Sequence, residues 1–133
     1  MPQHRYGLQE ARRQKRSDMK IVFAIIQPTK LRTVQEALYD AGVERITICD
    51  SQGFGRQKGQ TAMYRGVEYR SYMLRKVMLE IAVNDDFLEK TIEIVSQAAR
   101  TGPEGTIGDG KIFVMPLEET IQISPEKRGP SAV

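Results

Sequence analysis

A glycine-rich segment in the second half of the chain has residue types that bind phosphate. Residues 105–111, GTIGDGK, have the G-x-x-x-x-G-K spacing of a phosphate-binding loop. The next residue is Ile112 instead of Ser or Thr, and the segment follows a predicted helix and precedes a strand, so it is not a Walker motif. Its backbone amides and Lys111 could still hold a phosphate, and the alternative interpretation is a glycine-rich turn.

A second candidate is the long irregular stretch 55–73, which separates two predicted strands. A loop of this length inside a compact domain is usually functional or disordered. Residues 55–76 carry six basic side chains against one acidic, a local charge of about +5, which gives this loop a basic surface. The stretch also holds three of the five tyrosines: Tyr64, Tyr69 and Tyr72.

The composition of the chain excludes several classes of function. The single histidine, His4, and the single cysteine, Cys49, leave no Ser/His or Cys/His pair, no disulfide framework and no multi-cysteine zinc site. No acid–base pair or nucleophile stands out, so we do not expect an enzyme. No apolar run approaches the roughly 18 residues that cross a membrane, and the basic N-terminus lacks a signal-like apolar core. We therefore expect a cytoplasmic protein without membrane insertion.

The net charge of +3 and the pI near 9.1 favour nucleic-acid binding only until the charge is located. Residues 1–18 account for the whole excess, and we predict them to be a disordered basic tail, with Met19 as a candidate native start. Residues 53–55, GFG, resemble part of an RNA-recognition signature, but the third predicted strand, VMLEIAV, has no aromatic residue. An RNA-binding ferredoxin-like domain is therefore an alternative, and we expect no nucleic acid as partner.

The periodicity predicts the elements that would position these candidates. Strands are expected at 20–26, 46–48, 77–83 and 112–115, with a short last strand near 121–123. Helices are expected from Leu31 to a stop at Gly42, and from a cap at Asn84 to a stop at Gly102. This β-α-β-β-α-β order predicts an α+β, ferredoxin-like sandwich with a long loop between strands two and three. Two helices cover only one sheet face, so we expect self-association to cover the other.

Residues 19–124 resemble the PII nitrogen-regulatory signal proteins, in four segments that occur in the family's order. They are IIQPTKL at 25–31, GFGRQKG at 53–59, YRGVEY at 64–69, and TG at 101–102 with IGDGKIFV at 107–114. The second and third resemble the family's T-loop, and the last resembles its B-loop. We predict a PII-like domain over 19–124, followed by a flexible C-terminal tail over 125–133.

The resemblance implies a homotrimeric signal protein with adenine nucleotide and 2-oxoglutarate as allosteric ligands. ATP or ADP would bind between protomers, with Mg²⁺ bridging ATP and 2-oxoglutarate. The T-loop, here 55–73, would dock on an ammonium transporter, nitrogen-assimilation enzymes or a nucleotidyltransferase. A PII-like interaction module that has lost nucleotide sensing is the second alternative.

The family's functional residues carry over as follows. Nucleotide binding is implied for Thr47, Gly55, Arg56, Gln57, Glu80, Gly108, Asp109, Gly110 and Lys111. The resemblance implies 2-oxoglutarate binding by Gln57, Lys58, Gly59 and Lys76, a Mg²⁺ contact by Gln57, and uridylylation or adenylylation at Tyr69.

Three positions depart from the family pattern at this site. Two arginines that hold phosphates fall at Gln122 and Ser124, and a basic residue facing 2-oxoglutarate falls at Gln27. Each lost hydrogen bond to a charged group costs about 1.5–3 kcal/mol. Two of them amount to about 3–6 kcal/mol, or about two to four decades of affinity. We therefore expect weak ATP binding.

Overall fold

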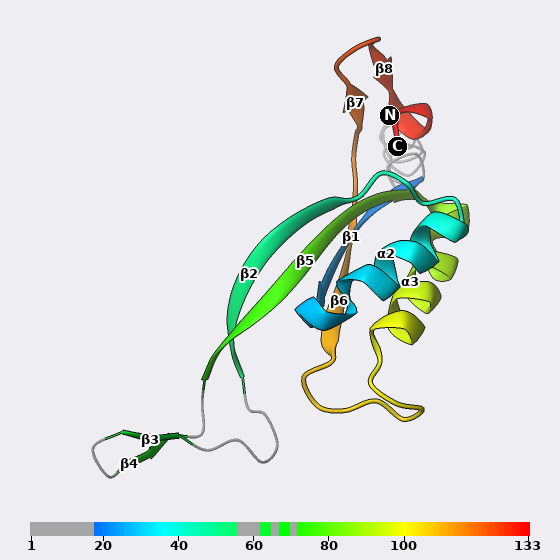
Figure 1. The fold of residues 1–133 in the computed structure, drawn as a ribbon. Coiled ribbons are helices and arrows are strands. Elements are labelled where there is room, and N and C mark those ends of the chain that lie inside the picture. The colour runs from blue at the N-terminus through cyan, green and yellow to red at the C-terminus, as the bar shows by residue number, and fades with distance from the viewer. Residues whose placement is uncertain (1–17, 56–61, 65–66, 70–71) are drawn as a thin grey trace, which may run out of the picture.

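The structure is a computed structural model, and it describes residues 18–55, 62–64, 67–69 and 72–133. One four-stranded antiparallel sheet and two helices form the body (Figure 1). The strands are β1 (Met19–Ile26), β2 (Thr47–Gly55), β3 (Ala62–Tyr64), β4 (Val67–Tyr69), β5 (Tyr72–Asn84), β6 (Gly110–Pro116), β7 (Ile121–Gln122) and β8 (Lys127–Arg128). The helices are α2 (Leu31–Asp40) and α3 (Asp85–Ala99), with the short 3-10 turns η1 (Pro28–Lys30) and η2 (Gly129–Ala132).

The main sheet has the order β2-β5-β1-β6, so β1 and β5 are central and β2 and β6 are edges. Both helices pack on one face (Figure 1). This arrangement is the ferredoxin-like fold that the order of predicted elements indicated. Among the described helices, none is long and apolar enough to cross a membrane.

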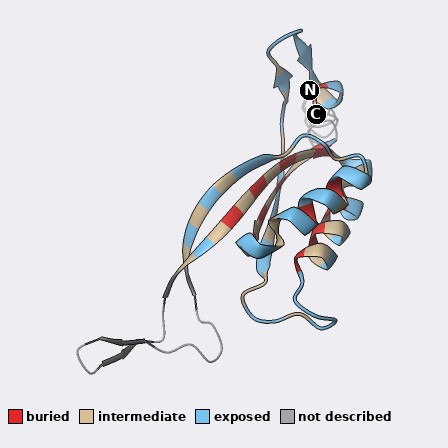
Figure 2. Ribbon diagram, in the orientation of Figure 1, coloured by how far each residue is buried: buried red, intermediate tan, exposed pale blue. Residues whose placement is uncertain are grey.

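The hydrophobic core lies between the helices and the central strands (Figure 2). Val22, Ala24 and Ile26 alternate along β1 and are at most 1% exposed, which is the two-residue period of a strand with one face covered. Val34 and Leu38 of α2 are four residues apart and fully buried, as are Thr91 and Val95 of α3 to within 1%. The buried Thr91 hydroxyl donates to the carbonyl of Phe87 at 2.8 Å, so this polar group is satisfied.

Gly42 ends the first helix as its sequence position predicted. It has φ +92°, and its amide donates to the carbonyl of Tyr39 at 2.9 Å. The amide of Val43 donates to the carbonyl of Leu38 at 2.8 Å, which completes the paired bonds of a Schellman motif.

The second and third strands extend much further than the sequence pattern indicated. β2 and β5 pair continuously from Thr47↔Glu80 to Gly55↔Tyr72, well beyond the sheet body. The outer part of this ribbon contains Asp50, Gln52 and Gly53, so apolar residues do not alternate along it. The sequence pattern therefore did not predict a strand there. The stretch predicted as a loop over 55–73 also contains the hairpin β3–β4, with Ala62 opposite Tyr69.

Two expectations that involve the last residues of the chain differ from the structure. Asn84 is the N-cap residue of α3, but its side chain makes no capping bond and its amide donates to the carbonyl of Pro130 at 3.4 Å. Residues 125–133, predicted as a flexible tail, contain β8 and η2, and Ala132 is buried. The short last strand predicted near 121–123 is present as β7, whereas its two-residue partner β8 is too short to produce a periodic signal and was not predicted.

The sheet face opposite the helices is apolar and largely uncovered in this chain. Ile21, Phe23 and Ile25 of β1 point to this face and are partly exposed. Phe113 of β6 lies opposite Phe23 and is 49% exposed, and Met115 is 46% exposed. Within the described part of the chain, no helix or strand packs on these side chains.

Candidate functional site

The glycine-rich loop connects α3 to the edge strand β6 and is fixed at the point where it enters the sheet. Gly110 pairs with Ile26 and has φ +135°, a conformation that only glycine adopts easily. A Cβ at this position would overlap the carbonyl oxygen of Ile25. The backbone of β6 therefore approaches β1 as closely as it does because residue 110 has no side chain.

Asp109 organises the interior of this loop. One carboxylate oxygen accepts the amides of Thr101 at 3.0 Å and Thr106 at 2.8 Å. The other accepts the two threonine hydroxyls, at 2.7 Å from Thr101 and 3.2 Å from Thr106. These bonds, with the Thr101 hydroxyl contributing most, hold the pKa of Asp109 well below its usual range. The carboxylate is thus ionised at neutral pH and closes the loop on itself.

The carbonyl of Gly108 attaches the loop to the sheet. The ammonium of Lys76 donates to this oxygen at 2.7 Å, and the side-chain amide of Gln27 donates at 3.2 Å. Lys76 lies on β5 and Gln27 directly follows β1. Lys76 therefore touches the glycine-rich loop, which the sequence had not indicated.

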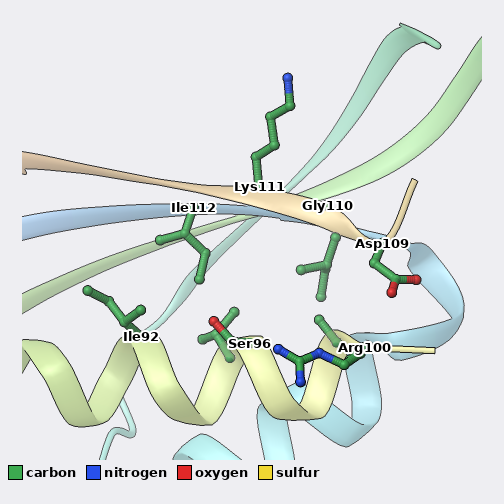
Figure 3. Close-up of a pocket in the computed structure, with 10 residues that line it drawn as sticks. Ile92, Ser96, Arg100, Asp109, Gly110, Lys111 and Ile112 are labelled. Atoms are coloured by element: carbon green, nitrogen blue, oxygen red, sulfur yellow. The ribbon is translucent and has the colours of Figure 1, made fainter. Parts of the chain in front are cut away.

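Lys111 projects from the open side of the sheet. In Figure 3 it points away from α3, whereas its neighbour Ile112 points toward Ile92 of that helix. A groove of about 370 Å³ lies on the helix side and is lined mainly by apolar side chains such as Ile92, Val95 and Ile112. The lining also includes Arg100 and Asp109, but most of its surface is apolar. Because the Lys111 ammonium points away from this groove, we locate the candidate anion site on the open side of the sheet.

The structure brings the described candidates together in two groups. Gly108, Asp109, Gly110, Lys111 and Lys76 meet at one corner of the sheet. Thr47 and Glu80 are direct cross-strand partners on β2 and β5. Since Thr47 is on one edge strand and Lys111 on the other, about 14 Å of sheet separates the two strands.

Comparisons with known proteins agree on one family. A family model described as "Nitrogen regulatory protein P-II" matches residues 19–127. This chain belongs to the P-II family. It is 48% identical over 115 residues to the nitrogen regulatory protein P-II of Azospirillum brasilense, covering 86% of this chain and all of that one. It is 50% identical over 105 residues to the GlnK of Escherichia coli K12, covering 79% and 91% of the two chains.

A solved P-II structure has the same fold. The Arabidopsis thaliana PII bound to citrate matches with a TM-score of 0.71 and 33% identity, covering 88% of this chain and 94% of that chain. The P-II relatives are regulatory proteins by name, and the resemblance seen in the sequence is thereby confirmed at the level of the family and the fold.

Several of the predicted site residues fall outside the described part of the chain. Arg56, Gln57, Lys58 and Gly59 lie in the gap 56–61. Gly55 is described and ends β2 opposite Tyr72, and Tyr69 lies in β4. The nucleotide, 2-oxoglutarate, Mg²⁺ and modification roles of these residues stay predictions.

Three residues that take part in the loop geometry had not been predicted: Thr101, Thr106 and Gln27. Thr101 and Thr106 were not singled out, although Thr and Asp side chains in a glycine-rich turn tend to bond to local backbone. Gln27 was noted only for the basic residue it replaces. Gln122, a second departure from the P-II pattern, donates to the carbonyls of Ser124 at 3.4 Å and Pro125 at 3.1 Å.

Proposed function

We propose that this P-II protein is a cytoplasmic, homotrimeric signal protein of nitrogen metabolism that binds ATP or ADP. In the proposal, 2-oxoglutarate and Mg²⁺ bind beside ATP, and the loop 55–73 regulates an ammonium transporter or nitrogen-assimilation enzymes. Modification of Tyr69 by a nucleotidyltransferase belongs to the same proposal. Membership in the P-II family supports the regulatory role.

One observation carries the nucleotide assignment. The Asp109 bonds hold the loop in one shape from within, with Gly108 at φ +97° and Gly110 at φ +135°. Lys111 follows directly and is exposed on the open sheet face. A preformed turn of glycine amides next to an ammonium suits a phosphate group, because little conformational entropy is lost on binding.

The other ligands fit the same corner to different degrees. Lys76, on β5 and separated from β6 by β1, supplies a cation for a carboxylate of 2-oxoglutarate. No group of three or more acidic, histidine or cysteine ligands occurs among the residues with described positions. In the proposal Mg²⁺ is therefore held by the nucleotide phosphates and by the amide oxygen of Gln57.

Calorimetry with ATP tests the nucleotide assignment. We expect binding in the presence of Mg²⁺ with a dissociation constant in the micromolar range or weaker, because Gln122 and Ser124 stand where phosphate-binding arginines are expected. Submicromolar affinity would contradict this expectation. Absence of any ATP or ADP binding would contradict the nucleotide assignment and support an interaction module instead.

The trimer has its own test, which uses the uncovered sheet face. Phe113→Asp places a charge opposite Phe23 on the uncovered sheet face, and a buried unpaired charge strongly disfavours association. Light scattering after size exclusion should show a trimer for the wild type and a monomer for the variant. Tyr39→Asp, on the outer face of α2 and 64% exposed, is the matched control and should stay trimeric. A wild-type monomer would contradict the proposed assembly.

A further inference from the structure

One backbone oxygen accepts hydrogen bonds from two side chains, one on strand β5 and one in the residue that directly follows β1. The carbonyl of Gly108 accepts the ammonium of Lys76 at 2.7 Å and the amide of Gln27 at 3.2 Å. The strand register explains why they meet there. Ile26 pairs with Val77 on one side and with Gly110 on the other, so the residues one step further along lie around the same corner.

These two bonds differ from the other bonds of the loop in what they connect. The four bonds to Asp109 come from Thr101 and Thr106, so they join parts of the loop to one another. The bonds to Gly108 join the loop to β1 and β5. The first set gives the loop its shape, and the second sets its position on the sheet.

The two donors also differ in their chemistry. A lysine ammonium binds a carboxylate more strongly than a neutral carbonyl, so an anionic ligand beside β5 would draw Lys76 away from Gly108. The Gln27 amide is neutral and is not drawn away in this manner. Both side chains are only partly exposed, which limits the competition from water for these bonds.

We propose that Gln27 and Lys76 together position the glycine-rich loop, and that Gln27 holds it when an anionic ligand takes Lys76. Lys76 is then a positioning residue for the glycine-rich loop even when no oxoacid is bound. The identity of the anion as a 2-oxoglutarate carboxylate rests on the proposed function. The positioning role does not.

Hydrogen exchange in the ligand-free, full-length protein tests the positioning role directly. Amides in a peptide spanning 105–112 should exchange roughly 2- to 10-fold faster in Gln27→Leu, and about 10-fold faster or more in Lys76→Met, given the usual strengths of neutral and charged hydrogen bonds. Lys76→Arg keeps a charged donor and should restore most of the protection. Gln35→Leu and Arg75→Met, both exposed positions outside the site, are the matched controls and should exchange like the wild type.

The double variant tests whether Gln27 holds the loop when Lys76 does not. If Gln27 holds the loop when Lys76 is absent, Gln27→Leu should have a larger effect in the Lys76→Met background than in the wild type. An increase no greater than the product of the single effects would overturn that role. Wild-type exchange in both single variants would overturn the positioning role altogether.

ATP titration without oxoacid separates this inference from the proposed function. If Lys76 served only to bind the oxoacid, Lys76→Met would leave the ATP affinity unchanged. If Lys76 positions the loop, Lys76→Met should lower the ATP affinity about tenfold. If the wild type binds no ATP but the exchange rates rise as expected, the proposed function fails and the positioning role stands. If ATP binds and the exchange rates do not change, the positioning role fails alone.

Discussion

Replacing Asp109 with asparagine is expected to lower the stability of the protein and, under the proposed function, its affinity for ATP. The variant keeps the size of the side chain but loses the negative charge, and its NH₂ group would face N–H or O–H donors of Thr101 and Thr106. Loss of charged hydrogen bonds at this partly exposed site should cost about 1–3 kcal/mol at pH 7. Because the glycine-rich loop would lose the bonds that hold its shape, the affinity for ATP should fall by at least about tenfold.

The pH dependence of the Asp109 effect distinguishes a charge effect from a packing effect. The folded pKa of Asp109 is lowered, so its contribution is complete above the unfolded value of about 4 and is lost as the pH falls below it. Urea denaturation from pH 7 to pH 3 should therefore show a difference between wild type and variant that shrinks in acid. Asp40→Asn, an exposed carboxylate on α2, is the control. A difference that stayed constant over this range would count against the charge explanation.

Replacing Gly110 with alanine is expected to lower the stability of the protein more than adding one methyl group at any other position of the site. The added Cβ would overlap the carbonyl of Ile25, which is backbone in a central strand and cannot swing aside. The left-handed conformation costs about 1–2 kcal/mol for an alanine, and the overlap adds to it, so a total loss of roughly 3 kcal/mol or more is expected. Urea denaturation measures this loss.

Gly42→Ala is the matched control for the effect of geometry. Gly42 also has positive φ, at +92°, but nothing lies within 4 Å of a Cβ placed there. It should show only the conformational cost, about 1–2 kcal/mol. Equal losses in the two variants would mean that the close approach of β6 to β1 does not matter for stability.

The sequence was sufficient for the fold because the core signals are local and repeated. β1 and both helices bury side chains at regular spacing, and Gly42 ends its helix with the expected paired bonds. The outer ribbon of β2 and β5 could not be predicted, since its pairing depends on register between strands and not on an apolar face. Asn84 is the N-cap residue as predicted, but its side chain bonds to Pro130, 46 positions along the chain, and this partner could not be predicted for a related reason.

The candidate site was predictable as a set of residue types but not as a set of contacts. Glycines and a lysine at fixed spacing indicate phosphate from sequence alone. That Lys76 and Gln27 share one carbonyl follows from the order β2-β5-β1-β6, which brings together residues separated by 32 and 81 positions. Composition and spacing within a segment contain no information about such pairs.

Because β5 is long, a single strand contacts the glycine-rich loop and also leads into the loop 55–73. The strand runs without interruption from Tyr72, where the loop 55–73 ends, through Lys76 and Glu80 to Asn84 at the start of α3. At about 3.3 Å per residue, Lys76 lies only about 13 Å from the base of that loop along one hydrogen-bonded strand. Leu79 and Ile81, both fully buried, anchor this strand in the core. One continuous strand therefore joins the corner that contains Lys76 to the base of the loop 55–73.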